Sequence, residues 1–147
     1  MGERRLSREL ALQVMYQMEH GQESAEEALR LFRSNFHAPT HLMHYAQSLV
    51  LGMAQHMGGL DDAISQASPR WKVERMSRID RNILRLAVYE IIHAAVPPKA
   101  AINEAIELAK QFGGDDSPAF INGVLDAVLN NLGNKTTSEH GAAAMQE

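Results

Sequence analysis

RIDRNILRLAVYEIIHAAV, residues 78–96, is the stretch of the sequence that decides the fold. On an α-helix, which turns by about 100° per residue, its polar side chains gather within an arc of roughly 120°. The opposite face is apolar and so wide that other elements must cover it on several sides. We therefore expect this helix to lie at the centre of an all-helical domain, with one polar stripe facing solvent. The stripe comprises Arg78, Arg81, Asn82, Arg85, Tyr89 and His93.

Helical signals continue from this segment towards both ends of the chain. Capping residues open helices at Ser24 and Ser77, and the pair Gly58–Gly59 is expected to end the third helix. No segment shows the alternation of a β-strand, so we predict an all-α fold of about seven helices. The expected helices span residues 6–20, 24–36, 40–57, 61–67 and 78–96, the segment between Pro98 and Gly113, and residues 117–132.

The chain is expected to form one domain, residues 1–132, followed by a tail. Residues 133–147 are small and polar without periodicity, which predicts a disordered C-terminal tail. Gly123 interrupts the last helix, and we expect it to permit the close approach of another helix backbone. Trp71 follows a Ser-Pro turn and is expected to anchor the junction before the central helix.

Composition limits the classes of function. The chain has 147 residues, of which 45% are hydrophobic and 22% charged, as in ordinary soluble globular proteins. It has no cysteine, so neither disulfides nor thiolate chemistry contribute. The N-terminus lacks the apolar run of a signal peptide, and no stretch has the roughly eighteen apolar residues of a membrane span. We expect a cytoplasmic protein without membrane contact.

The basic residues are concentrated in two short regions, although the formal net charge is −4. Residues 1–8 carry +2, residues 70–85 carry +4, and the rest of the chain carries −10. Nine of the fourteen lysines and arginines thus lie within twenty-four positions. Such local asymmetry is compatible with an anionic partner despite the negative total.

Each basic region admits two interpretations. Arginines bind phosphates with a planar fork and tyrosines stack on bases, so Arg4, Arg5, Arg8 and Tyr16 could form an RNA-binding face. A solvated, basic start of a helix explains the same residues. The three arginines of the central stripe repel one another, which is compatible with an anionic partner and equally with a solvated face.

The loop GGDDSPA, residues 113–119, lies between Phe112 and Phe120. Aromatic side chains at loop edges stack on unpaired bases, but they also pack against the ends of helices. Asp115 and Asp116 either complement the dipole of the last helix or accept hydrogen bonds from base edges. Both interpretations remain open from the residues alone.

Catalytic and metal sites find little support in the sequence. His41 and His44 share a helix face, but no carboxylate stands nearby to complete a metal site. Gly113–Gly114 lacks the Lys-Ser/Thr of a phosphate-binding loop. We predict no catalytic residues, no metal and no cofactor.

Five segments resemble the NusB family of bacterial transcription antitermination factors. The resemblance implies two three-helix subdomains, about residues 1–68 and 69–132. It also implies a non-enzymatic protein that binds single-stranded boxA RNA of nascent ribosomal RNA transcripts together with NusE, a ribosomal small-subunit protein. Such proteins help RNA polymerase to read through terminators, and some form homodimers. The segments are RRLSRELALQVMYQ (4–17), Trp71, IDRNILRLAVYE (79–90), AINEAIELAKQFG (101–113) and DSPAFINGVLD (116–126), with a gap over residues 20–68.

The resemblance also assigns roles to particular residues. Glu74 and Asp80, which point away from the Arg85 stripe, would face NusE. Replacing Arg8 or Arg85 by alanine is expected to weaken boxA binding and leave melting unchanged. The implied RNA-binding residues are Arg4, Arg5, Arg8, Tyr16, Arg85, Phe112, Asp116 and Phe120.

Two departures from the family pattern remove positive charge. Leu6 and Ser7 interrupt the first arginine run, and Pro118–Ala119 stand where a basic residue is frequent. We therefore expect weak RNA affinity without NusE. The alternative function is a helical interaction module that docks an acidic protein on the arginine stripe without binding RNA.

Overall fold

Seven α-helices and one 3₁₀ turn make up the described part of the chain. The computed structural model describes the backbone of residues 2–35 and 37–146, and the side chains of 4–35 and 37–133. No strand occurs in these ranges, so the all-α prediction is confirmed. The elements are α1 (Gly2–Gly21), α2 (Ala25–Asn35), α3 (Thr40–Gln55), α4 (Met57–Ala67), η1 (Val73–Arg75), α5 (Arg78–His93), α6 (Pro98–Phe112) and α7 (Ser117–Gln146).

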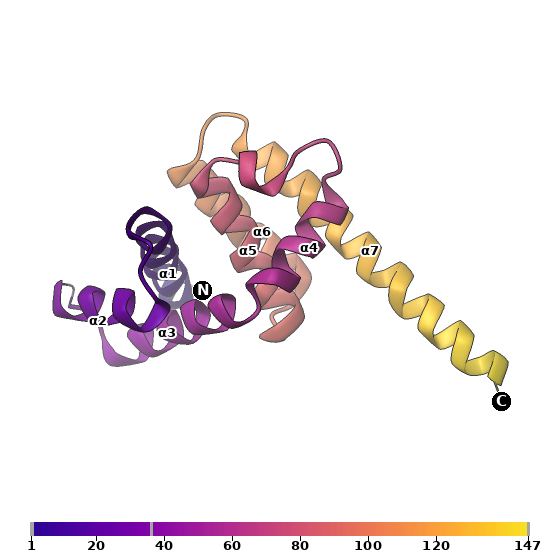
Figure 1. Cartoon of the computed structure of the whole chain (residues 1–147), viewed down its shortest axis with the longest axis horizontal. Helices are drawn as coiled ribbons and strands as arrows, with labels where there is room; N and C mark the ends of the chain where they lie inside the picture. The colour runs from indigo at the N-terminus through magenta and orange to yellow at the C-terminus, as the bar shows by residue number, and fades with distance from the viewer. Residues whose placement is uncertain (1, 36, 147) are drawn as a thin grey trace.

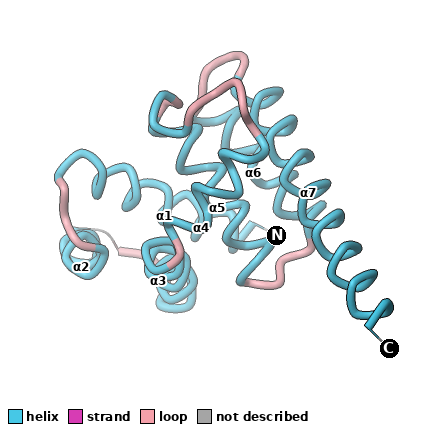
Figure 2. Tube along the Cα trace, turned by 45° about the vertical axis from the view of Figure 1, so that its right-hand side comes forward, coloured by secondary structure: helices cyan, strands magenta, loops and turns pink. Residues whose placement is uncertain are grey.

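Helix α5 lies at the centre of the bundle, as its wide apolar face predicts. It contacts α1, α3, α4, α6 and α7. Helix α2 packs on α1 and α3, so these three helices form one side of the molecule, and α6 and α7 lie on the other (Figures 1 and 2). Helix α1 packs mainly on α3, α5 and α2, and a groove lies open on its remaining surface.

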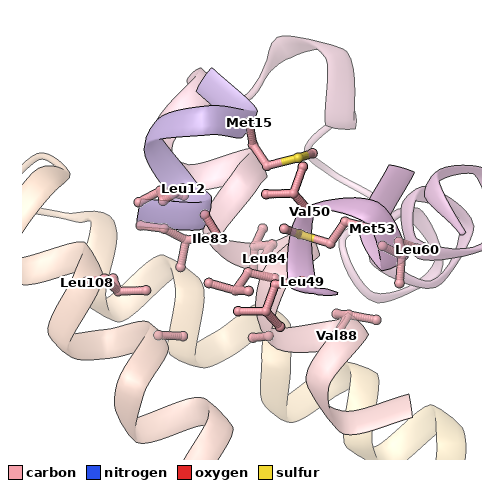
Figure 3. Packing of buried hydrophobic residues seen from close by; sticks show 14 of the residues in the cluster. Leu12, Met15, Leu49, Val50, Met53, Leu60, Ile83, Leu84, Val88 and Leu108 are labelled. Atoms are coloured by element: carbon pink, nitrogen blue, oxygen red, sulfur yellow. The ribbon is translucent and has the colours of Figure 1, made fainter. Parts of the chain in front are cut away.

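A single apolar core runs through the molecule and joins residues of all seven helices. Ile83, Leu84 and Val88 of α5 are completely buried. Figure 3 shows side chains of α1, α3, α4 and α6 around them, including Met15 and Met53. Burial of each such side chain contributes about 1.5–3 kcal/mol, so this core is the main source of stability. The subdomain boundary at about residue 68 stays a prediction.

Two helices begin at the capping residues that the sequence predicts. The Oγ atom of Ser24 accepts a hydrogen bond from the Glu27 amide at 3.2 Å, and that of Ser77 accepts one from the Asp80 amide at 3.1 Å. Helix α5 ends at His93, three residues earlier than predicted, and Ala95 then adopts a left-handed conformation with φ of 54°. The chain can therefore turn before the prolines that open α6.

The predicted end of α3 at Gly58–Gly59 is wrong. The chain bends at His56, whose amide donates to the Gly52 carbonyl at 3.1 Å. The His56 carbonyl in turn accepts the first hydrogen bond of α4, from the Leu60 amide at 3.0 Å. One residue thus ends α3 and begins α4, so the two glycines lie inside the first turn of α4.

Two further expectations about the C-terminal helix differ from the structure. A Cβ atom added at Gly123 would meet nothing within 4 Å, so this glycine borders open space and not another backbone. Residues 133–146, predicted to be disordered, continue α7 as helix and project away from the bundle (Figure 1).

Gly52 is the glycine at which two helices approach closely. A Cβ atom there would collide with the Tyr89 ring, so we expect Gly52→Ala to lower the free energy of unfolding by about 1–3 kcal/mol. The matched Gly59→Ala, whose Cβ would meet nothing within 4 Å, should raise it by about 1 kcal/mol. Urea denaturation measures both changes, and equal effects of the two variants would contradict the assignment.

Candidate nucleic-acid interface

The basic start of α1 is held against the rest of the molecule by internal partners. The guanidinium of Arg4 lies over the Tyr45 ring, 4.8 Å from its centre. Arg5 donates two hydrogen bonds to Glu104 of α6, from Nε at 2.9 Å and Nη2 at 3.1 Å. The Arg5 side chain is nevertheless 43% exposed. Arg4 and Arg5 therefore retain a face towards solvent.

Arg8 has no such face, because it is buried in an ion pair. Its Nε lies 2.9 Å from both carboxylate oxygens of Glu90 on α5, and its Nη1 lies 3.9 Å from Glu104. The Tyr45 hydroxyl donates to the same Glu90 at 2.6 Å. Burial and this hydrogen bond raise the pKa of Tyr45 to about 12. Arg8 thus joins α1 to α3, α5 and α6.

Arg85 is the centre of a second buried cluster, so the expectation that its stripe faces solvent is wrong. Arg85 is 8% exposed and forms a bidentate ion pair with Asp61 of α4, in which its Nε donates at 2.7 Å and its Nη2 at 2.9 Å. Its Nη1 also donates to Glu19 of α1 at 2.7 Å and to Asn82 at 3.2 Å. This arginine is neutralised by the protein's own carboxylates.

The other two stripe arginines extend this cluster towards solvent. Arg81 pairs with Glu19 at 2.8 Å, whereas Arg78 lies 3.9 Å from Glu19 and donates to His20 Nδ1 at 3.2 Å. Arg78 is 42% exposed and lies over the Tyr16 ring, 5.8 Å from its centre. Of the three arginines, Arg78 is the one available to an outside anion. Arg81 also donates to the carbonyl groups of Val73, Glu74 and Met76.

The carboxylates of these clusters are the residues that the sequence reasoning missed. Glu90 falls in the middle of the apolar face of α5, and Glu104 falls between apolar residues of α6. An isolated acidic residue on an apolar face indicates a buried partner, because an unpaired buried charge is costly. Glu19 and Asp61 give no such signal, since neither lies at the centre of an apolar face.

The ion pairs make the folded state sensitive to acid. Burial alone would raise the pKa of Glu19, but Arg81 and Arg85 outweigh it and hold this pKa below its ordinary 4.5. The hydrogen bond from Arg5 is the main cause of the lowered pKa of Glu104. Both pKa values are lower in the folded state than in the unfolded chain. The ion pairs of Glu19 and Glu104 therefore stabilise the folded state fully above about pH 4.5, and this stabilisation is lost at lower pH.

We therefore expect the melting temperature to fall as the pH is lowered from 4.5 towards 3. The Glu104→Gln variant should show a shallower decline over this range, since it removes one of the titrating groups. Thermal unfolding followed by circular dichroism measures both curves. Parallel curves for the two proteins would show that Glu104 is not a source of the acid sensitivity.

A groove on the outer face of α1 brings Tyr16 and Phe112 together. The groove has a volume of about 590 Å³, and Leu12 and Ile79 also line it. Tyr16 is 43% exposed there, with Arg78 above its ring. The Glu9 carboxylate also lines the groove. An aromatic surface beside an exposed guanidinium group is nevertheless what single-stranded nucleic acids bind.

A second hollow contains Asp116 and Phe120, but it also contains Asp80. Its volume is about 440 Å³, and Asp115 and Trp71 share its lining. The resemblance assigned Asp116 to RNA and Asp80 to NusE, and the structure places both residues in one hollow. Glu74 is exposed within η1. The roles of these residues in binding stay predictions.

These features define a small all-helical protein with a candidate RNA-binding face on α1. The chain belongs to the NusB family, whose sequence profile matches residues 5–130. The transcription antitermination protein NusB of Anaeromyxobacter dehalogenans is 46% identical over 127 residues, 86% of this chain and 89% of the relative. That of Geobacter sulfurreducens is 43% identical over 137 residues, 92% of this chain and 99% of the relative.

Solved structures of NusB share the fold. T. maritima NusB superposes with a TM-score of 0.77 at 30% identity, covering 85% of this chain and 89% of the other. A crystal structure of the antitermination factors NusB and NusE with double-stranded RNA contains a chain that superposes with a TM-score of 0.79 at 25% identity. The match covers 89% of this chain and 98% of that one. The family resemblance is therefore confirmed.

The described residues form neither a metal site nor a membrane-spanning helix. No group of three or more histidine, aspartate or glutamate side chains in this part of the chain could hold a metal ion. In the same part, no helix is both long and apolar enough to cross a membrane.

Proposed function

We propose that this protein is an RNA-binding transcription antitermination factor. It acts with a NusE partner on boxA single-stranded RNA of nascent ribosomal RNA transcripts and promotes read-through by RNA polymerase. The observation that carries the proposal is the similarity, over 89% of this chain, to a chain of the NusB–NusE–RNA complex. The exposed arginines and aromatic side chains of the α1 face support it with chemistry that suits RNA.

The RNA contacts are assigned to the residues that remain accessible on this face. Arg4, Arg5 and Arg78 neutralise phosphates and set the register of the strand, which releases counterions. Tyr16 stacks on an unpaired base, and Phe112 closes the groove beside it. Each of the three arginines already has an internal partner, so little side-chain entropy is lost when RNA binds.

Arg8 and Arg85 have a different role in this proposal. Both are buried and paired with carboxylates, so they position α1 on α5 and leave the phosphate contacts to others. The alternative of an acidic protein docked on the arginine stripe loses its support for the same reason. A partner cannot reach Arg85 without displacing Asp61 and Glu19.

The protein acts as a non-enzymatic adaptor in the cytoplasm, within an RNA polymerase antitermination complex. Glu74 and Asp80 are assigned to NusE, and Asp116 with Phe120 to the neighbouring edge of the RNA surface. A homodimer that covers this surface would compete with RNA. Two proteins on one short RNA gain affinity through shared contacts, so NusE should strengthen binding.

Arg5→Ala is the direct test of the α1 face. It should weaken binding to boxA RNA. It should also reduce the steepness of the plot of log affinity against log salt by about one, as expected for the loss of one phosphate contact. Fluorescence anisotropy with labelled boxA and scrambled RNA, with and without NusE, measures both. Arg30→Ala, an exposed arginine of α2, is the matched control. If the two variants bind with the same affinity and salt slope, the face is wrongly assigned.

A further inference from the structure

Trp71 is the most exposed large apolar side chain that the structure describes. It is 62% exposed in the loop between α4 and η1, so it does not anchor the junction as the sequence suggested. Its chain neighbours Arg70 and Lys72 are also exposed, and neither is paired with a carboxylate of a described residue. Figures 1 and 2 show this loop beside the α6–α7 loop, at the same end of the molecule.

Trp71 does not stand alone, because the Phe120 ring supports it. The two rings meet edge to face, with 6.2 Å between their centres and 83° between their planes. This contact fixes the indole at the rim of α7 while most of its surface stays in water. The result is an exposed aromatic surface between two cations, Arg70 and Lys72, that no carboxylate of a described residue pairs with.

The two sides of this aromatic pair differ in charge. One side is the hollow lined by Asp80, Asp115 and Asp116 and by one cation, Arg75. Its three carboxylates outnumber that cation and would repel a phosphate. On the other side, a separate hollow of about 380 Å³ is lined by Arg70 and by no carboxylate of a described residue. Gly123 lies in its wall, and a Cβ atom there would meet nothing within 4 Å. The hollow thus offers flat, uncharged walls beside a cation.

We propose that Trp71 stacks on an unpaired RNA base in the hollow beside Gly123, while Arg70 and Lys72 bind the flanking phosphates. This second contact lies outside the α1 groove and rests on the RNA-binding function proposed above. Alternating cations and an aromatic platform are the general means of binding single strands. A protein segment fits less well, because two unpaired cations would then need matching carboxylates.

The intrinsic fluorescence of the protein tests the contact directly, because Trp71 is its only tryptophan. Stacking on a base quenches indole emission and shields it from iodide. Titration of the full chain with boxA RNA should quench the emission in parallel with binding measured by anisotropy. An RNA of the same length with abasic positions should bind more weakly and quench less.

Two variants separate the base contact from folding. Trp71→Ala should weaken binding roughly fivefold to a hundredfold, the usual effect of losing one base–aromatic stack, whereas Trp71→Phe should retain most of it. Gly123→Leu fills the hollow and should weaken binding comparably while the melting temperature stays the same or rises. A loss of affinity without a loss of stability cannot come from misfolding.

The outcomes distinguish this contact from the function on which it rests. If anisotropy shows RNA binding but emission is unchanged and Trp71→Ala binds normally, the contact is overturned and the RNA-binding function stands. If boxA RNA does not bind with or without NusE, both fail. If NusE alone quenches and shields Trp71, and RNA adds nothing, the surface belongs to a protein partner and the proposal is overturned.

Discussion

Replacing Arg85 by alanine should destabilise the fold by about 2–4 kcal/mol. The change leaves the carboxylates of Asp61 and Glu19 close together without the cation between them, and it leaves Asn82 without a partner. Removing one member of a fully buried ion pair costs about 3–5 kcal/mol. The expected cost is lower here because both carboxylates keep some exposure to water.

Urea denaturation followed by circular dichroism measures the effect. The matched control is Arg30→Ala, which removes an exposed arginine paired with Glu27 at 3.6 Å and should change stability by less than about 0.5 kcal/mol. Equal midpoints for the two variants would show that the Arg85 cluster contributes nothing to stability.

The same variant separates the two possible roles of Arg85 in RNA binding. If Arg85 only positions helices, boxA affinity measured far below the melting temperature should remain close to that of the unchanged protein. If Arg85 contacts phosphate, affinity falls even where the variant is fully folded. The expectation from sequence, weaker binding with unchanged melting, is the reverse of what the buried cluster implies.

The sequence was sufficient to predict the architecture because its signals are local. The apolar face of residues 78–96 placed α5 at the centre, and Ser24 and Ser77 cap helices as their spacing predicts. The end of α3 was misplaced because glycine commonly ends helices, whereas here the bend depends on His56 and on the packing of α4.

The sequence was insufficient to predict what covers the polar stripe. A helical wheel gives the direction of a side chain but not the element in front of it. Arg85 faces Glu19 and Asp61, which are 66 and 24 residues away in the chain. A stripe of arginines facing water and one facing acidic residues of other helices look alike on the wheel. Only the tertiary arrangement distinguishes them.

Glu90→Gln is expected to have the largest effect of any single substitution considered, about 3–5 kcal/mol. Glutamine keeps the size of the side chain but removes the charge opposite Arg8, which is buried. The next carboxylate of a described residue, that of Glu104, lies 3.9 Å from Arg8. Thermal and urea unfolding measure the loss. Glu107→Gln, on the exposed face of α6, is the matched control and should stay within about 0.5 kcal/mol.

A triple variant tests whether the buried ion pair serves stability or the positioning of the basic face. Replacing Arg8 and Glu90 by methionine and Tyr45 by phenylalanine removes the polar network without leaving a charge or hydroxyl unpaired. Such replacements are often neutral or stabilising, so most of the stability lost in Glu90→Gln should return. Without Glu90 the Tyr45 ring loses its fixed orientation, and Arg4 loses a defined position above it. If stability is restored but boxA binding is weaker than in the unchanged protein, the network positions the basic face. If stability and boxA affinity both equal those of the unchanged protein, the network has no role in RNA recognition.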